Sequence, residues 1–160
     1  MYRTGVGYDV HKLAPDRDLI LGGLKIDYSL GLVGHSDADV LTHAIIDAIL
    51  GAACMGDIGQ RFPDTDEKYR DISSLSLLRT VVDELPNYEI INIDAIVVAQ
   101  KPKLASYMNS IRTNLTRIVK TPYVNIKATT TEKLGFEGRC EGISAHAICT
   151  LRLKLQNDQY

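Results

Sequence analysis

The chain has 160 residues, of which 45% are hydrophobic and 24% charged, and its formal net charge is -2 at pH 7. This length and composition suit one soluble globular domain, over residues 1–160, with a core of its own. The balance of 18 basic against 20 acidic residues argues against nucleic acid as a partner, although a local basic cluster could hold a small phosphate ligand.

Cysteine usage and hydropathy predict a cytoplasmic protein. Cys54, Cys140 and Cys149 show no CxxC spacing and no secretion signal precedes them, so we expect reduced thiols, buried as small apolar side chains. The apolar segment around residues 45–55 is interrupted by Asp47 and a glycine, which excludes a membrane span.

The N-terminal part of the chain has two predicted strand regions. Residues 2–8 alternate weakly between polar and apolar side chains, which predicts a strand that ends at a loop over residues 9–11. Residues 19–26 predict a small hairpin with two glycines at its turn.

The clearest predicted helix follows, with Ser36 or Asp37 as its N-cap. Asp39, His43 and Asp47 are spaced by four residues and share one polar face, which we expect to point toward the loop at residues 9–11. The apolar stripe of this helix comprises Val40, Leu41, Ala44, Ile45, Ala48, Ile49 and Ala52.

The rest of the chain alternates helices and strands, which predicts an α/β (α+β layered) domain: a mixed β-sheet with helices on one or both faces. In the last predicted strand His146 lies opposite the apolar stripe, and we expect a structural or interfacial role for it. The predicted elements are a loop at 56–66, helices at 73–85 and from after Pro102 to 118, and strands at 90–99, 124–129 and 143–153.

Asp9, His11 and His43 form a candidate metal site. One carboxylate and two imidazoles from two elements suit zinc with an open fourth position, as in catalytic zinc sites. Asp39 and Asp47 could accept a hydrogen bond from the second nitrogen of His43. The alternative is that His43 is a hydrogen-bonded helical histidine and Asp9 an ordinary turn residue.

Four further segments carry groups that could bind phosphates or hydroxyls. For each, a structural explanation competes: an N-cap for Gly34–Asp37, a continuing strand for Thr129–Thr131, and solvated or turn residues elsewhere. The candidate groups are His35 and Ser36, the threonines with Glu132, Lys101 and Lys103, and the acidic residues of 57–66. Arg139 and Glu141 are predicted to form an ion pair.

Seven blocks of sequence are distinctive when read in order. They are Gly7–His11, Gly34–Val40, Gly51–Ala53 with Gly56–Gly59, Phe62–Asp66, Ala99–Lys103, Lys127–Phe136 and Gly138–Ile143. Together they resemble the family of 2-C-methyl-D-erythritol 2,4-cyclodiphosphate synthases of the non-mevalonate isoprenoid pathway, over nearly the whole chain. Cys140 replaces an expected Gly or Ser, and Glu67 a frequent proline.

The resemblance implies the chemistry of the site. Zinc would be held by Asp9, His11 and His43, and a second cation, Mg²⁺ or Mn²⁺, by Glu132, while His35 and Thr130 would stabilise the transition state. Ala99–Ala105 and Ala128–Thr131 would bind the cytidine diphosphate, and Asp57–Gly59 and Phe62–Asp66 the methylerythritol phosphate. The implied substrate-binding residues are Asp9, His11, His35, Ser36, Asp57, Gly59, Phe62, Asp64, Asp66, Ala99, Lys103, Ala105, Ala128, Thr129, Thr130, Thr131, Glu132, Phe136 and Arg139.

The resemblance also implies a homotrimer with active sites between subunits and an isoprenoid diphosphate bound on the threefold axis, near Phe136, Arg139 and Glu141. The implied reaction is an intramolecular phosphoryl transfer that releases CMP. Two other functions compete with it: a zinc phosphohydrolase that uses metal-bound hydroxide, and a non-catalytic trimeric module that binds nucleotide or isoprenoid.

Overall fold

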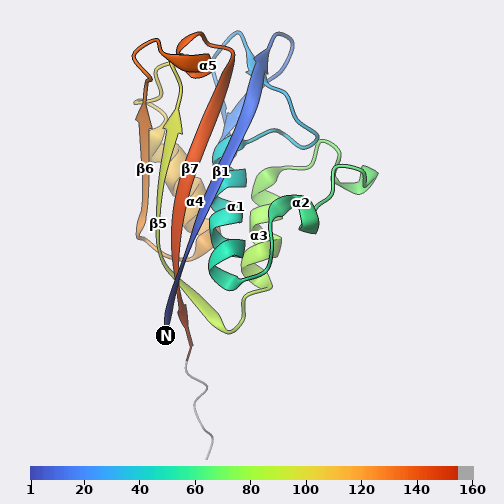
Figure 1. Cartoon of the computed structure of the whole chain (residues 1–160), viewed down its shortest axis with the longest axis vertical. Coiled ribbons are helices and arrows are strands. Elements are labelled where there is room, and N and C mark those ends of the chain that lie inside the picture. Colours follow the sequence, from blue (N-terminus) through green and yellow to red (C-terminus); the bar gives the residue numbers. More distant parts are fainter. Residues whose placement is uncertain (155–160) are drawn as a thin grey trace, which may run out of the picture.

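The computed structural model describes residues 1–154 as a five-stranded sheet with α1 and α4 packed on one face and α3 packed against these two helices (Figure 1). This confirms the predicted layered α+β architecture. The sheet contains β1 (Tyr2–Ala14), β4 (Gly31–Leu32), β5 (Tyr88–Val98), β6 (Val124–Thr129) and β7 (Gly142–Leu153), and β2 (Leu19–Leu21) and β3 (Leu24–Ile26) form the predicted hairpin. The helices are α1 (Val40–Ala53), α2 (Ile58–Arg61), α3 (Ser74–Asp83), α4 (Met108–Val119), α5 (Gly135–Gly138) and a 3₁₀ turn η1 (Glu67–Tyr69).

The strands are ordered β4-β1-β7-β5-β6, with β5 and β6 parallel and every other neighbouring pair antiparallel. Pairing between β1 and β7 runs without interruption from Tyr2 opposite Arg152 to Lys12 opposite Gly142. The prediction of a loop at residues 9–11 was therefore wrong. The polar side chains of this segment suggested a loop, but the long partner strand keeps its backbone extended.

Alternation along β7 places its two faces in different environments, as predicted. Ile143, Ala145, Ala147, Cys149 and Leu151 are buried under the helices, whereas Leu153, predicted in the same stripe, is 37% exposed at the strand end. On the other face of the described sheet, apolar side chains remain exposed on β1 and β7, namely Tyr2, Val6, Tyr8, Val10 and Ile148.

Two glycines in β1 allow α1 to lie directly on the sheet. A Cβ atom at Gly5 would stand 2.2 Å from the carbonyl oxygen of Ala48, and one at Gly7 would stand 1.9 Å from that of Ala44. Both distances are far below van der Waals contact, so only glycine permits this approach. The approach brings His43, the residue before Ala44, over the strand that carries Asp9.

The N-cap of α1 is Asp39, and the prediction of Ser36 or Asp37 was wrong. Asp39 accepts hydrogen bonds from the Thr42 amide at 3.0 Å, the Thr42 hydroxyl at 2.7 Å and the Gly23 amide at 2.7 Å. Ala38 has a φ of 55°, in the left-handed region, which ends the loop and delays the start of the helix.

Other boundaries differ in smaller ways. The predicted loop at 56–66 contains α2, because Asp57 caps it by accepting the Gln60 amide at 2.8 Å. The helix expected after Pro102 begins at Met108, whereas β6 matches its predicted range. Cys149 is buried, but Cys54 is exposed and Cys140 half-buried, which corrects the prediction for those two. No helix within residues 1–154 is long and apolar enough to cross a membrane.

Candidate metal centre and its pocket

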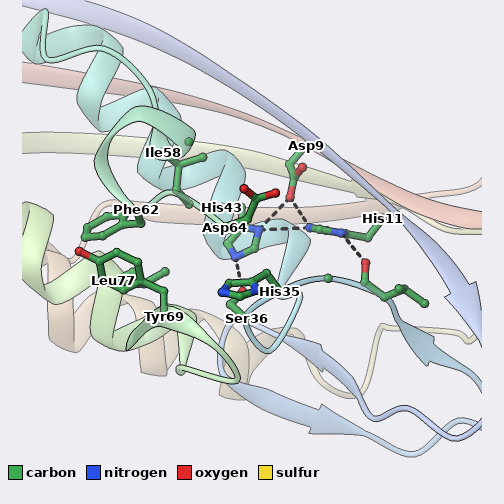
Figure 2. Close-up of a pocket in the computed structure, with 13 residues that line it drawn as sticks. Asp9, His11, His35, Ser36, His43, Ile58, Phe62, Asp64, Tyr69 and Leu77 are labelled. Atoms are coloured by element: carbon green, nitrogen blue, oxygen red, sulfur yellow. Dashed lines mark hydrogen bonds and ion pairs between the residues drawn. The ribbon is translucent and has the colours of Figure 1, made fainter. Parts of the chain in front are cut away.

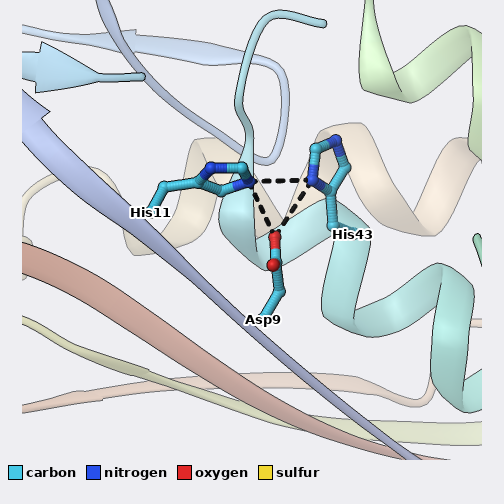
Figure 3. A group of neighbouring side chains, drawn as sticks. All are labelled: Asp9, His11 and His43. Carbon is cyan, nitrogen blue, oxygen red and sulfur yellow. Dashed lines mark hydrogen bonds and ion pairs between the residues drawn. The ribbon is translucent and has the colours of Figure 1, made fainter. Parts of the chain in front are cut away.

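Asp9, His11 and His43 converge as predicted (Figure 3). Asp9 Oδ2 lies 2.9 Å from His11 Nε2 and 3.0 Å from His43 Nδ1, and the two nitrogens are 3.2 Å apart. A tetrahedral zinc ion with bonds of about 2.0–2.1 Å separates its ligand atoms by roughly 3.3 Å. A slight opening of the triad would therefore accommodate the ion.

Each imidazole of the triad has a second ring nitrogen that faces away from Asp9, and the contacts of these two nitrogens support a cation at the triad. His11 Nδ1 lies 2.8 Å from the carbonyl oxygen of Val33, which can only accept, so Nδ1 carries the proton and the Nε2 lone pair of neutral His11 faces Asp9. His43 Nε2 lies 2.8 Å from the Ser74 hydroxyl and 3.1 Å from the Ser36 hydroxyl. The donor set, one carboxylate oxygen and two imidazole nitrogens, fits zinc.

The charges within the triad are coupled. Burial alone would raise the pKa of Asp9, but its interactions with the imidazoles of His11 and His43 outweigh burial and hold the pKa of this carboxyl well below its usual range. Burial lowers the pKa of His11, but the hydrogen bond and charge of Asp9 outweigh it, so the pKa of His11 lies above its ordinary value. In the absence of a metal ion the triad therefore favours a proton between Asp9 and His11.

We expect the metal-free protein to be less stable at pH 8 than at pH 6. A raised pKa means that the stabilisation from His11 is complete below its unfolded pKa, about 6.5, and is lost as pH rises through the higher folded pKa. The depressed pKa of Asp9 keeps its contribution constant over this window, since that contribution is lost only in strong acid.

Urea unfolding of chelator-treated protein at a fixed concentration measures this difference. His11→Gln should remove most of it. Excess zinc should reverse the trend, because protons compete with the metal for the same nitrogens. Equal midpoints at pH 6 and pH 8 in metal-free protein, with no effect of His11→Gln, would contradict the coupling.

The triad opens into a cavity of about 450 Å³ (Figure 2). The cavity also contains His35 and Ser36, which the sequence singled out, on the loop before α1. Because Asp39 is the N-cap of α1, the N-cap explanation for this loop was wrong, whereas anion binding by His35 and Ser36 stays a prediction. The predicted residues that line this cavity are Asp9, His11, His35, Ser36, His43, Gly59, Phe62 and Asp64.

An apolar wall completes the cavity. Ile58 of α2, Tyr69 of η1 and Leu77 of α3 line it, and the rings of Phe62 and Tyr69 meet edge to face with centroids 5.3 Å apart. Sequence reasoning did not assign Tyr69 or Leu77 to the site. Leu77 is an apolar helix residue like many others, and its position in the cavity wall depends on how α3 packs on α1.

A second cavity, of about 380 Å³, is lined by residues of the two segments that the family resemblance assigns to the cytidine diphosphate, 99–105 and 128–131. It lies where β5 and β6 end in parallel, so Val98 and Thr129 are neighbours in the sheet. Its predicted lining residues are Ala99, Lys103, Ala105, Ala128, Thr129 and Thr130, and Met108 of α4 adds an apolar side chain. Among the described residues these groups share no cavity with the metal triad.

Six of the implied substrate-binding residues line neither cavity. Asp57 and Asp66 cap α2 and η1, and Thr131 donates to the Leu134 carbonyl. Glu132 accepts a 2.7 Å hydrogen bond from the Thr130 hydroxyl, beside the second cavity. Phe136 and Arg139 belong to the α5 region, where Arg139 forms the predicted ion pair with Glu141 through two hydrogen bonds of 2.8 and 2.9 Å.

The residues behind the metal triad differ from those predicted. The Asp39 carboxylate is occupied by α1 capping, and the Asp47 carboxylate accepts the Ile58 amide at 2.7 Å, so neither carboxylate is a hydrogen-bond partner of the His43 ring. Burial raises the pKa of both carboxyls. The groups that contact His43 Nε2 are the hydroxyls of Ser74 and Ser36. Ser74 lies 31 positions from His43 in sequence, and no local pattern indicated the contact.

Comparison with known proteins gives matches over nearly the full length. The chain is 56% identical over 154 residues to the 2-C-methyl-D-erythritol 2,4-cyclodiphosphate synthase of Desulforamulus reducens, covering 94% of this chain and 98% of that protein. It is 60% identical over 153 residues to the protein of the same name from Agathobacter rectalis, covering 93% of this chain and 86% of that protein.

The solved structure of IspF from Plasmodium falciparum in a CDP complex superposes with a TM-score of 0.84 at 34% identity. The match covers 96% of this chain and 97% of that chain. A model of the YgbB family matches residues 2–152. The chain therefore belongs to the YgbB family.

Proposed function

We propose that the protein converts 4-diphosphocytidyl-2-C-methyl-D-erythritol 2-phosphate to 2-C-methyl-D-erythritol 2,4-cyclodiphosphate and releases CMP. The observation that carries this function is the full-length identity of 56–60% to proteins named as synthases of that product. The convergent triad of Asp9, His11 and His43 supplies a metal site at the base of a cavity, as this chemistry needs.

The reaction closes a ring. An oxygen of the 2-phosphate forms a bond to the β-phosphorus of the diphosphate, the bond from that phosphorus to the bridging oxygen breaks, and CMP leaves with the electron pair. The nucleophile is already an ionised phosphate, so no strong base is needed. The protein must bring two anionic groups together and hold them in line.

We propose zinc as the metal at the triad. When bound by Asp9, His11 and His43, zinc would neutralise charge on a phosphate oxygen and orient it through its open coordination position. The hydroxyl of Ser36 borders the same cavity, 3.1 Å from His43 Nε2, and is a candidate donor to a substrate oxygen. His35 lines the cavity and would donate to a phosphate oxygen of the substrate.

The second cavity is the proposed site for the cytidine diphosphate. The CDP complex of the Plasmodium falciparum relative supports a cytidine nucleotide as ligand of this fold. Thr129 and Thr130 offer hydroxyls, Lys103 offers a positive charge, and Leu104 and Met108 offer apolar surface to a base. Across the metal cavity, Asp57, Gly59 and the segment 62–66 would then hold the methylerythritol phosphate.

Glu132 is proposed to hold the second cation, Mg²⁺ or Mn²⁺, together with the substrate phosphates. Thr130 donates to Glu132 Oε1 at 2.7 Å, which leaves the Oε2 atom for a cation. We expect Glu132→Gln to lower activity about 100-fold and to abolish the response to added Mg²⁺ or Mn²⁺, while zinc content is unchanged. Activity titrated with Mg²⁺, beside elemental analysis for zinc, checks this; a normal Mg²⁺ response would assign the cation elsewhere.

A homotrimer with active sites between subunits is proposed because each chain holds the two halves of the site in separate cavities. The sheet face opposite the helices also carries exposed apolar side chains, with Val6 71% and Ile148 47% exposed, which a second copy would cover. Light scattering should give three times the chain mass. A monomer mass at micromolar concentration would rule out this assembly.

An isoprenoid diphosphate on the threefold axis is a further part of the proposal. Arg139 is its candidate anion-binding group, and Phe136, half-buried against Gly142, its candidate apolar contact. Because Arg139 forms a two-point ion pair with Glu141, a diphosphate would have to compete with that carboxylate.

The proposed function is tested by incubating the purified protein with the substrate and Mg²⁺ and analysing the products by mass spectrometry. CMP and the cyclic diphosphate in equal amounts are expected. Inorganic phosphate without CMP would identify a phosphohydrolase, and binding of CDP without any product would identify a non-catalytic module. Either of these two results would overturn the proposal.

A further inference from the structure

A buried serine at the start of α3 lies directly behind the metal triad. Ser74 has 0% exposure, and its hydroxyl oxygen lies 2.8 Å from His43 Nε2. The same hydroxyl contacts Asp37 Oδ1, and the Ser74 amide donates to Asp37 Oδ2 at 3.0 Å. His43, Ser74 and Asp37 thus form one hydrogen-bonded row leading away from the triad.

The direction of each hydrogen bond in this row follows from Asp37, the residue at its far end. An ionised Asp37 can only accept, so the Ser74 hydroxyl donates to it. The serine oxygen is then an acceptor toward His43, and the Nε2 atom of His43 must carry the proton. With Nε2 protonated, the lone pair of His43 Nδ1 points at Asp9, where a metal ion needs it.

We propose that Ser74, oriented by Asp37, is a positioning residue for the metal: it fixes the tautomer and the ring orientation of His43. This inference rests on metal binding by the triad, which is part of the proposed function, and not on the identity of the substrate. It assigns roles to two residues that touch neither the metal nor the substrate.

Backbone hydrogen bonds also tie the loop that faces the cavity to the segment before α3. The Asp37 amide donates to the Ile72 carbonyl at 3.1 Å, and the Asp71 amide donates to the His35 carbonyl at 2.9 Å. The loop with His35 and Ser36 is thereby tied to the segment that leads into α3. Ser74 therefore connects the orientation of a metal ligand to the position of two cavity-lining residues.

A purely structural role is the competing explanation, because Asp37 also accepts the first amide of α3. Ser73, the N-cap by position, makes no side-chain capping bond within residues 1–154. A capping role alone would change stability when Ser74 is altered, but it would leave the zinc affinity of the folded protein unchanged. The two explanations therefore differ in a measurable quantity.

The test compares Ser74→Ala with Ser73→Ala, a matched exposed serine one position away. Zinc affinity is measured by competition with a chromophoric chelator, and ligand geometry by the d–d absorption of the Co²⁺-loaded protein. We expect Ser74→Ala to bind zinc 10- to 100-fold more weakly, the range found for lost outer-shell partners, and to alter the Co²⁺ spectrum. Ser73→Ala should change neither.

Ser74→Thr and Asp37→Asn complete the experiment. Ser74→Thr keeps the hydroxyl and should recover most of the affinity lost in Ser74→Ala. Asp37→Asn no longer forces the direction of the serine hydroxyl and should weaken zinc binding several-fold even if Ser74→Ala fails to fold. Circular dichroism identifies the folded variants.

Unchanged zinc affinity and Co²⁺ spectra in folded Ser74→Ala and Asp37→Asn would overturn the inference and leave the proposed function standing. Conversely, a protein that shows these metal effects but forms no CMP would overturn the proposed function and leave the inference standing.

Discussion

Replacing His43 with alanine is expected to remove the bound metal and to lower kcat/KM by about three orders of magnitude or more. Zinc at such a site supplies several kcal/mol of charge stabilisation, and each 1.4 kcal/mol corresponds to about a factor of ten in rate. The variant should also leave the Asp9 and His11 pair with two ligand atoms, too few for a stable zinc site. Elemental analysis and the CMP-release assay measure the two losses.

His35→Ala is the matched control for this experiment. His35 lines the same cavity but lies outside the triad, so its removal should lower turnover while the zinc content stays near one ion per chain. Stoichiometric zinc in purified His43→Ala would show that the ligand assignment is wrong. Loss of zinc in His35→Ala would show that metal retention reports general damage to the cavity.

Gly7→Ala is expected to destabilise the protein by about 3 kcal/mol, at the upper end of typical overpacking effects. The new Cβ atom would stand 1.9 Å from the Ala44 carbonyl oxygen, and backbone atoms must move to relieve that contact. Because His43 precedes Ala44 on α1, the shift carries the ligand away from Asp9. We therefore expect zinc affinity to fall by about tenfold or more.

Gly51→Ala is the control for the glycine experiment. Gly51 lies on α1, and a Cβ there would meet nothing closer than 3.8 Å, so alanine should be neutral or stabilising by about 0.5–1 kcal/mol. Urea unfolding at one protein concentration compares the variants, since assembly makes stability depend on concentration. A Gly7→Ala protein with wild-type stability and zinc affinity would contradict the contact between β1 and α1.

Together these experiments separate three levels of the site. The ligand variant tests which atoms hold the metal, the glycine variant tests the packing that brings them together, and the Ser74 variants test the hydrogen bonds that orient them. An effect on zinc is expected at all three levels. A large loss of global stability is expected for Gly7→Ala, because Gly7 lies on β1 in direct contact with α1.

Much of the fold follows from local sequence patterns. The stripe of α1, the Gly22-Gly23 hairpin, β6 and the alternation of β7 were predicted because each depends on periodicity or turn chemistry within a short segment. The metal triad was predicted as well, because its few residue types are distinctive and the resemblance to a known family placed them in order.

Three of the errors share one physical cause. Asp9–His11 looked like a loop until the pairing of β1 with β7 extended it, and the N-cap of α1 moved to Asp39 because Gly23 from the hairpin also donates to that carboxylate. The outer contact of His43 went to Ser74 rather than to a residue on its own helix. In each case the deciding hydrogen bond joins segments remote in sequence.

The sequence by itself determined the types of elements, the apolar faces and the ligand residues, because these depend on side-chain chemistry and short-range spacing. The tertiary structure decided which atoms of those residues face one another. It did so through the closeness of Gly7 to α1, which sets the position of His43, and through Ser74 and Asp37, which orient its ring. Distances between remote segments arise from packing, and no local pattern contains them.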